Sequence, residues 1–187
     1  MLALWIVLGI IALIVIFFIF NYNGLVRLRN QRENAWAQID VQLKRRYDLI
    51  PNLMETVKGY MSHERETLEA VTNARNLAQQ TPSGDVGARS KAEGELSSAL
   101  ARLLAVVENY PDLKANQNFL ALQEELTSTE NKISFSRQYY NDSVLRLNNK
   151  IQMFPSNMVA AMTGFKLGEF FEITVAEERE VPKVSFA

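Results

Sequence analysis

The chain has 187 residues, with 20 Lys or Arg against 21 Asp or Glu, and its formal net charge is −1. This balance lacks the basic excess that nucleic-acid-binding domains need, so we expect no nucleic acid among its partners. Cysteine is absent, which excludes disulfide frameworks, thiolate metal sites and cysteine nucleophiles. Only five Pro and eight Gly are present, a pattern typical of long helices rather than of a turn-rich β fold.

The first predicted element is an unbroken apolar run, Leu2 to Phe20, that carries no charged residue. A helix rises about 1.5 Å per residue, so about 20 residues span a hydrocarbon core about 30 Å thick. A cleaved signal peptide is the alternative, but the basic leading segment and the small-residue cleavage site are both missing. We therefore predict a transmembrane anchor over residues 1–21, with lipid-facing side chains that include Leu2, Trp5, Phe17, Phe18 and Phe20.

Cations follow the apolar run, whereas only the α-amino group precedes it. The flanking residues are Arg27, Arg29 and Arg32. Positive charges near a membrane span tend to stay in the cytoplasm. We therefore expect the N-terminus to lie outside and the C-terminal domain to be cytoplasmic, with the lipid bilayer as a partner.

Residues 22–172 are predicted to form a helical bundle with a membrane-proximal stalk. Two rows of large side chains repeat every seven residues beside each other: Trp36, Leu43, Ile50 and Val57, and Tyr47, Met54, Met61 and Leu68. Such a stripe is expected for bundle or coiled-coil packing. It predicts one long helix from the membrane to about Gln79.

Three further helices follow, separated by Pro-containing breaks. The segment Thr81–Asp85 is a turn, and the next helix carries Leu96, Leu100, Leu103 and Val107 on one face. Pro111 suits the first turn of a third helix, whose stripe runs from Phe119 to Phe154. Phe154-Pro155 ends it, because a residue before proline resists helical geometry. A short fourth helix holds Met158 to Phe165, and residues 173–187 are predicted to be a C-terminal tail.

The helix lengths leave the stalk without obvious cover from its own chain. The second and fourth helices are too short to reach along the stretch from Arg27 to about Ile50, whose large apolar residues favour burial. Either the second and third helices form one bent rod that returns along the first, or other subunits cover the stalk. Asn141 and Asn148 are seven residues apart on one face, a spacing that in bundles fixes register and partner choice. Candidate oligomer or partner contacts are therefore Trp36, Leu43, Ile50, Asn141 and Asn148.

No pattern of catalytic or metal-ligating residues is visible. His63 is the only histidine, and no Glu-x-x-His pair of the kind that di-iron bundles use occurs. A glycine-rich phosphate loop and a Gly-x-Ser-x-Gly turn are also missing. We therefore expect no enzymatic activity and no cofactor.

Motifs along nearly the whole chain resemble the LemA family. They are Trp36-x-x-Ile39-Asp40-Val41-Gln42-Leu43-x-Arg45-Arg46-x-Asp48-Leu49-Ile50-Pro51-Asn52-Leu53, Val57-Lys58-Gly59-Tyr60, Tyr110-Pro111-x-Leu113-Lys114-Ala115, Gln123-x-Glu125-Leu126, Thr129-Glu130-Asn131, Arg137-x-x-Tyr140-Asn141, Phe154-Pro155-Ser156-Asn157 and Gly164-Phe165. The resemblance implies a bacterial single-pass protein of the inner (plasma) membrane with a soluble four-helix bundle. No catalytic activity or cofactor is established for the family, so none can be carried over, and the resemblance favours an up-and-down bundle over the bent rod.

Two hypotheses for function follow. The first is a membrane-anchored scaffold or assembly protein that forms a homo-oligomer at the membrane, because the anchor and stripes come without chemical groups. The second is an adaptor that binds a membrane enzyme, protease or transporter through its bundle or its tail. The tail segment Val181–Phe186 motivates the second, since extended apolar–polar segments can add to a sheet edge or groove.

Overall fold

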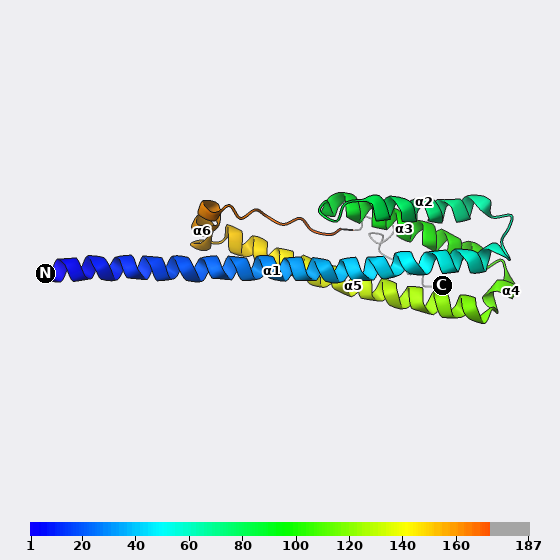
Figure 1. Ribbon diagram of the computed structural model, residues 1–187, viewed down its shortest axis with the longest axis horizontal. Helices are drawn as coiled ribbons and strands as arrows, with labels where there is room; N and C mark the ends of the chain where they lie inside the picture. The colour runs from blue at the N-terminus through cyan, green and yellow to red at the C-terminus, as the bar shows by residue number, and fades with distance from the viewer. Residues whose placement is uncertain (173–187) are drawn as a thin grey trace, which may run out of the picture. The chain divides into compact units, whose positions relative to one another are not determined.

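The computed structural model describes residues 1–172, and within that range every regular element is a helix (Figure 1). The all-α class is therefore confirmed. The elements are α1 (Leu2–Lys58), α2 (Arg65–Gln80), α3 (Val86–Val107), α4 (Pro111–Lys114), α5 (Gln117–Gln152) and α6 (Ser156–Thr163). The predicted tail, 173–187, lies outside the described residues.

The contacts divide the chain into two compact units. Unit 1 comprises Met1–Gln38 and Ser136–Glu169, and unit 2 comprises Ile39–Phe135 and Phe170–Ala187. The long helices α1 and α5 are each divided between the two units, with one part in each unit.

Unit 2 is an antiparallel bundle of four helical segments, in which α2 and α3 pack beside the parts of α1 and α5 that belong to it (Figure 1). Its core is built from apolar stripes of the kind that the spacing predicted. On α1 the buried residues are Ile39, Leu43, Ile50, Leu53 and Val57, and on α3 they include Leu96, Leu100, Leu103 and Val107. Burying these stripes against one another is what stabilises the helices in water.

The first helix ends earlier than the sequence predicted. It stops at Lys58, and a turn leads into α2, so the expected continuous helix to about Gln79 is wrong. The amides of Tyr60 and Met61 both donate to the carbonyl of Val57, at 3.0 and 2.9 Å, and close the helix end. Met61 is nevertheless fully buried. The seven-residue row therefore continues as a row of buried side chains although the helix itself has stopped.

This turn also corrects the expectation that the stalk lacks cover. Leu43 and Ile50 are 0% and 1% exposed, because α2 folds back and α1 is covered within unit 2 by α2, α3 and α5. The bent rod does not form either, since α3 and α5 run antiparallel within unit 2 (Figure 1). The chain's own helices therefore cover this part of α1 without a second subunit.

Unit 1 has a small core of its own around Leu25 of α1. Leu25, Leu147, Val159 and Ala160 are buried together, and Phe18, Leu28, Ile151 and Phe165 pack against them. The helix α6 thus packs against α1 and the end of α5. It ends at Gly164, whose φ of 73° is the left-handed conformation that glycine adopts most readily.

An extended segment after α6 is held to α5 at two places. Asn148 donates to the carbonyl of Gly168 at 3.0 Å and accepts from the Gly168 amide at 2.8 Å. The hydroxyl of Tyr140 donates to the carbonyl of Glu169 at 3.0 Å. These bonds satisfy backbone groups that no helix or strand pairs.

We expect the Asn148→Ala variant to release this segment, because it removes both hydrogen bonds to Gly168. The loss of a buried polar pair should cost about 1–3 kcal/mol of local stability. Hydrogen exchange followed by mass spectrometry should show faster exchange at residues 165–169. The exposed neighbour Asn149→Ala is the control and should leave exchange unchanged. Equal exchange in the two variants would contradict the claim that Asn148 holds this segment to α5.

Candidate functional site in the helical bundle

A charged residue occupies a core position of α1. Arg46 lies on the same stripe as Leu43 and Ile50, and its side chain is only 1% exposed. An isolated buried guanidinium is strongly unfavourable, so a buried arginine needs carboxylate partners close by.

The partners of Arg46 come from two other helices of unit 2. Its Nη1 donates to Glu130 Oε1 of α5 at 2.7 Å and to Ser97 Oγ of α3 at 2.9 Å, while Nη2 donates to Glu93 of α3. Arg46 therefore ties α1 to both α3 and α5.

Glu93 is the second centre of this cluster. It is fully buried and accepts from Arg46, from the hydroxyl of Tyr47 and from Arg89 Nε, the last at 3.1 Å. Arg89 also donates to Asp40 of α1 at 3.2 Å and to the carbonyl of Thr81 at 2.7 Å. We call the set Asp40, Arg46, Tyr47, Arg89, Glu93, Ser97 and Glu130 the buried ion cluster.

The surroundings of Arg46 and Tyr47 raise the pKa of both groups. Burial alone would lower the pKa of Arg46, but the carboxylates of Glu130 and Glu93 outweigh it and raise that pKa. Burial, followed by the charge of Glu93 and the hydrogen bond to it, raises the pKa of Tyr47 above its ordinary value. Both groups therefore keep their protons near neutral pH. Tyr47 acts there as a donor and not as a base.

The carboxylates of the cluster are engaged by arginines that come from the same bundle. Each carboxylate in it is paired with a guanidinium of the same chain. Within residues 1–172, no group of three or more metal-ligating side chains comes together. Within the cluster, Asp40, Glu93 and Glu130 are therefore held in ion pairs with Arg46 and Arg89.

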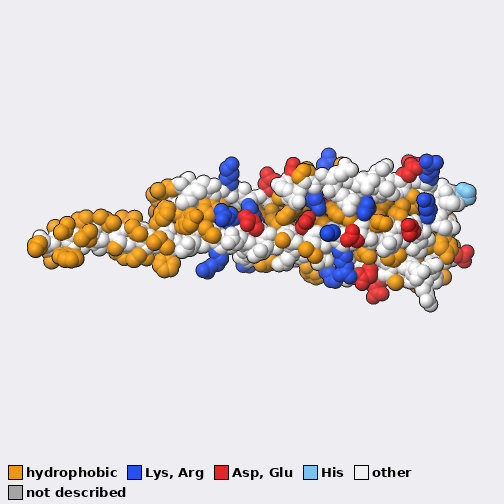
Figure 2. All heavy atoms as spheres, in the orientation of Figure 1, with side chains coloured by type: hydrophobic (Ala, Val, Ile, Leu, Met, Phe, Trp, Pro, Cys, Tyr) orange, Lys and Arg blue, Asp and Glu red, His pale blue; other side chains and the backbone are white. Residues whose placement is uncertain are grey.

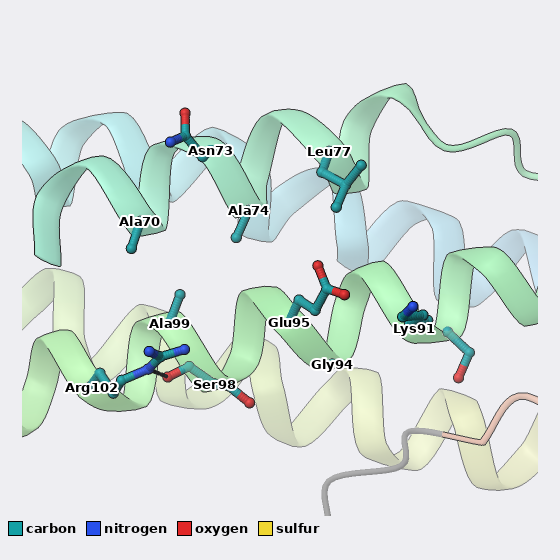
Figure 3. A pocket seen from close by; sticks show the side chains of 11 residues that line it. Ala70, Asn73, Ala74, Leu77, Lys91, Gly94, Glu95, Ser98, Ala99 and Arg102 are labelled. Atoms are coloured by element: carbon teal, nitrogen blue, oxygen red, sulfur yellow. Dashed lines mark hydrogen bonds between the residues drawn. The ribbon is translucent and has the colours of Figure 1, made fainter. Parts of the chain in front are cut away.

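An open groove runs between α2 and α3 on the outside of unit 2 (Figure 3). Its volume is about 620 Å³, and it is lined mainly by small side chains. Ala70 and Ala74 of α2 point toward α3, and Ala99 of α3 points toward α2. The polar side chains of its lining carry both signs and include Lys91, Glu95 and Arg102. Leu77 also lines it and remains 48% exposed.

Three of the five predicted contact residues lie inside the chain rather than on a free surface. Leu43 and Ile50 are buried in unit 2, and Asn148 is used by Gly168, so these three are not open to a second subunit. Trp36 is half-buried, with its ring centroid 5.2 Å from that of Tyr140. Asn141 is half-buried on α5. The structure therefore places Leu43, Ile50 and Asn148 in contacts within the chain.

The predicted anchor residues and cations are placed in unit 1. Leu2, Trp5, Phe17 and Phe20 are exposed, as lipid-facing side chains would be, and Phe18 is half-buried against the unit 1 core. Arg27 is exposed. Arg29 lies 5.5 Å from the ring centroid of Phe165, and both Arg29 and Arg32 approach Glu33, at 3.9 and 3.6 Å.

Sequence reasoning missed the roles of Arg46, Arg89 and Glu93, although a signal was present. On α3 the stripe of Leu96, Leu100, Leu103 and Val107 continues backwards by three and four residues to Glu93 and Arg89. On α1 the same stepping from Leu43 to Ile50 passes through Arg46. Opposite charges on the apolar faces of two helices predict a buried pair between them.

Comparison with known proteins places these observations in a family. The LemA family model matches residues 35–186. Protein LemA of Metamycoplasma hominis is 30% identical over 164 residues, which cover 87% of this chain and 71% of that protein. Magnetosome protein MamQ 2 of Paramagnetospirillum magneticum is 26% identical, covering 81% of this chain and 65% of that protein. MamQ of Magnetospirillum gryphiswaldense is 25% identical, with shares of 81% and 64%, so the chain spans just under two thirds of these MamQ proteins.

We expect the Glu93→Ala variant to lose much of its stability, because two buried guanidinium groups and one hydroxyl lose their shared acceptor. Breaking a buried pair in this way costs about 3–5 kcal/mol. The matched control is Glu125→Ala, which removes an ion pair with Arg45 whose side chains are about half exposed. That control should cost about 1 kcal/mol or less. Chemical denaturation followed by circular dichroism measures both, and equal losses would contradict a structural role for the cluster.

Proposed function

This chain belongs to the LemA family, and from that membership we propose that it is a membrane-anchored helical scaffold that self-associates at the membrane. It is a membrane-associated helical protein. The observation that carries the proposal is the open, small-residue groove between α2 and α3, next to a core in which the ionisable groups are already paired. The MamQ relatives have names that refer to a cell structure and not to a reaction, which agrees with an assembly role.

The anchor supports the membrane part of this proposal. Among the described helices, α1 is the one long and apolar enough to cross a membrane, judged by length and composition. Its most apolar window has a mean hydropathy of 3.2, and none of that window is buried by the protein. A stretch of this kind is stabilised by lipid rather than by water.

The shape of the groove supports self-association. Small residues such as Ala70 and Ala74 allow the backbone of another helix to approach closely, because the side chains at a contact set the distance between helices. Leu77 stands on the same surface as an exposed apolar side chain. In a two-fold symmetric pair, Leu77 of each copy would fill the alanine-lined part of the other.

An adaptor that binds a membrane enzyme, protease or transporter is the alternative. The groove would then receive a helix of that partner, and Lys91, Glu95 and Arg102 would select it by charge. The second proposed contact of the adaptor, the segment Val181–Phe186, lies outside the described residues.

We further propose that the protein has no enzymatic activity of its own. The pairing of Arg46, Arg89, Glu93 and Glu130 supports this, because a catalytic acid or base must be able to reach a substrate. His63 lies exposed in the turn between α1 and α2 and is not a member of the buried ion cluster.

We also propose the inner membrane as the location, with the N-terminus outside and the bundle in the cytoplasm. Arg27, Arg29 and Arg32 follow the apolar part of α1, and such cations tend to remain on the cytoplasmic side.

Filling the groove should prevent self-association. We expect wild-type protein in detergent or nanodiscs to form oligomers whose mass rises with concentration in analytical ultracentrifugation. The Ala74→Trp variant should be monomeric, because the indole occupies the space that the second copy needs. The control is Ala101→Trp, an exposed alanine of α3 outside the groove, which should behave as wild type. A monomeric wild-type protein over a wide concentration range would contradict the proposal.

A cysteine in the groove separates the two hypotheses, because the chain has no cysteine of its own. The Leu77→Cys variant should form a disulfide-linked homodimer when oxidised in membranes if the groove mediates self-association. A crosslinked product that contains a different protein would favour the adaptor instead.

Because the chain has no cysteine, single introduced cysteines can also test the membrane orientation of α1. We expect Leu2→Cys to react with a membrane-impermeant maleimide on intact spheroplasts, whereas Ser62→Cys, in the exposed turn before α2, should react only after lysis. The reverse pattern would overturn the proposed orientation.

A further inference from the structure

Large apolar side chains are exposed on and beside α6. Met158 and Met162, four residues apart and therefore on one face of the helix, are 60% and 77% exposed, and Phe154, just before the helix, is 78% exposed. The opposite face carries Val159 and Ala160, which are buried against α1 and α5. A helix that is apolar on both faces needs a second apolar partner for its exposed face. Contiguous exposed patches of this kind mark interaction sites.

The position of α6 along α1 identifies that environment. Its buried face contacts Leu25, and Phe18 packs on the same small core. Phe18 belongs to the apolar run that ends at Phe20, and Leu25 lies about 8 Å further along the helix. The polar interface of a bilayer extends roughly 5–8 Å beyond the hydrocarbon core on each side. The core of unit 1 therefore places α6 at the level where α1 leaves the hydrocarbon.

The apolar surface is continuous between the two helices. Figure 2 shows hydrophobic side chains covering the N-terminal part of α1 and continuing over the region of α6, with Lys and Arg appearing beyond them. The exposed residues Met153 and Leu167, 62% and 53% exposed, extend this surface on both sides of α6. In this view the Lys and Arg side chains lie beyond the surface and not between it and the membrane-spanning segment.

The charges around the surface are those that suit a phospholipid headgroup layer. Lys150 precedes α6 and Lys166 follows it, and no Asp or Glu occurs between these two lysines. Arg29 lies over the ring of Phe165, and Tyr22 contacts the same ring edge-on at 6.2 Å. Cations and aromatic rings are the side chains that favour the membrane interface.

We propose that α6 with its flanks, residues 153–167, is an interfacial membrane-binding element that inserts Phe154, Met158 and Met162 into the bilayer that α1 crosses. This depends on α1 being the membrane anchor and not on what the α2–α3 groove binds. Interfacial helices bury their apolar face about 5–10 Å into the boundary between headgroups and acyl chains. Together with α1 it gives unit 1 two attachments to one membrane, which fixes the rotation of α1 about its axis.

Site-directed spin labelling of the full chain tests this, because each variant has a single cysteine. Labels at Met158→Cys and Met162→Cys are compared with Phe20→Cys, the lipid reference, and Gln138→Cys, an exposed position of α5 in the same unit. The protein is reconstituted in vesicles of phosphatidylcholine with phosphatidylglycerol. Collision rates are measured with oxygen, which concentrates in lipid, and with a water-soluble nickel complex.

We expect the labels at 158 and 162 to resemble the label at 20, with frequent oxygen collisions and a loss of most nickel collisions relative to position 138. Nickel collisions as frequent as at position 138 would place the surface in water and overturn the proposal. Protection from both reagents would mean that a second copy covers α6, which also overturns it. If position 20 itself is reached by nickel, the anchor is wrong and both proposals fail. Circular dichroism of each variant verifies the fold.

Discussion

The structure of unit 2 depends on keeping the charge of Arg46 inside a bundle of apolar stripes. A guanidinium that is removed from water needs its counter-charges at hydrogen-bond distance, and here they come from Glu93 of α3 and Glu130 of α5. Apolar stripes alone would tolerate a shift of one helix along another by a turn. A buried pair does not, because such a shift would leave a charge without its partner. The cluster therefore fixes the axial register of α1, α3 and α5 relative to one another. Arg75 of α2 donates to the carbonyl of Tyr47 at 2.8 Å, which extends this constraint to α2.

This constraint also decides where a function can be located. Glu93 already accepts from three side chains, so the most buried carboxylate in the bundle has little capacity left for a substrate or an ion. Open surface includes the groove between α2 and α3, with Ala74 and Leu77 on it, and the apolar face of α6. Both are suited to binding another helix or a lipid layer.

Several elements were predictable because they follow from local periodicity. The apolar run, the stripe on α3 and the Pro-containing breaks before α4 and after α5 all lie where the sequence places them. The end of α1 was not predictable in this way, since Met61 keeps the seven-residue spacing while it lies in a turn. The partner of Asn148 was also hidden, because Gly168 belongs to a segment without any period. Arg46 and Glu93 could have been recognised as charges on apolar stripes. Which helices face each other depends on long-range packing, which no single stripe records.

The exposed residues of α6 show why exposure must be interpreted together with position. On the surface of a water-soluble domain, Phe154 and Met162 would be isolated unfavourable side chains. In unit 1, Met162 lies on the exposed face of α6 and Phe154 lies just before that helix. The other face of α6 packs against Leu25, shortly after the apolar run ends. A side chain at that depth faces headgroups and acyl chains, where burial of apolar area is favourable. The same packing that covers Leu25 therefore also sets the height of Phe154 and Met162, so one small core accounts for both the buried and the exposed apolar residues of α6.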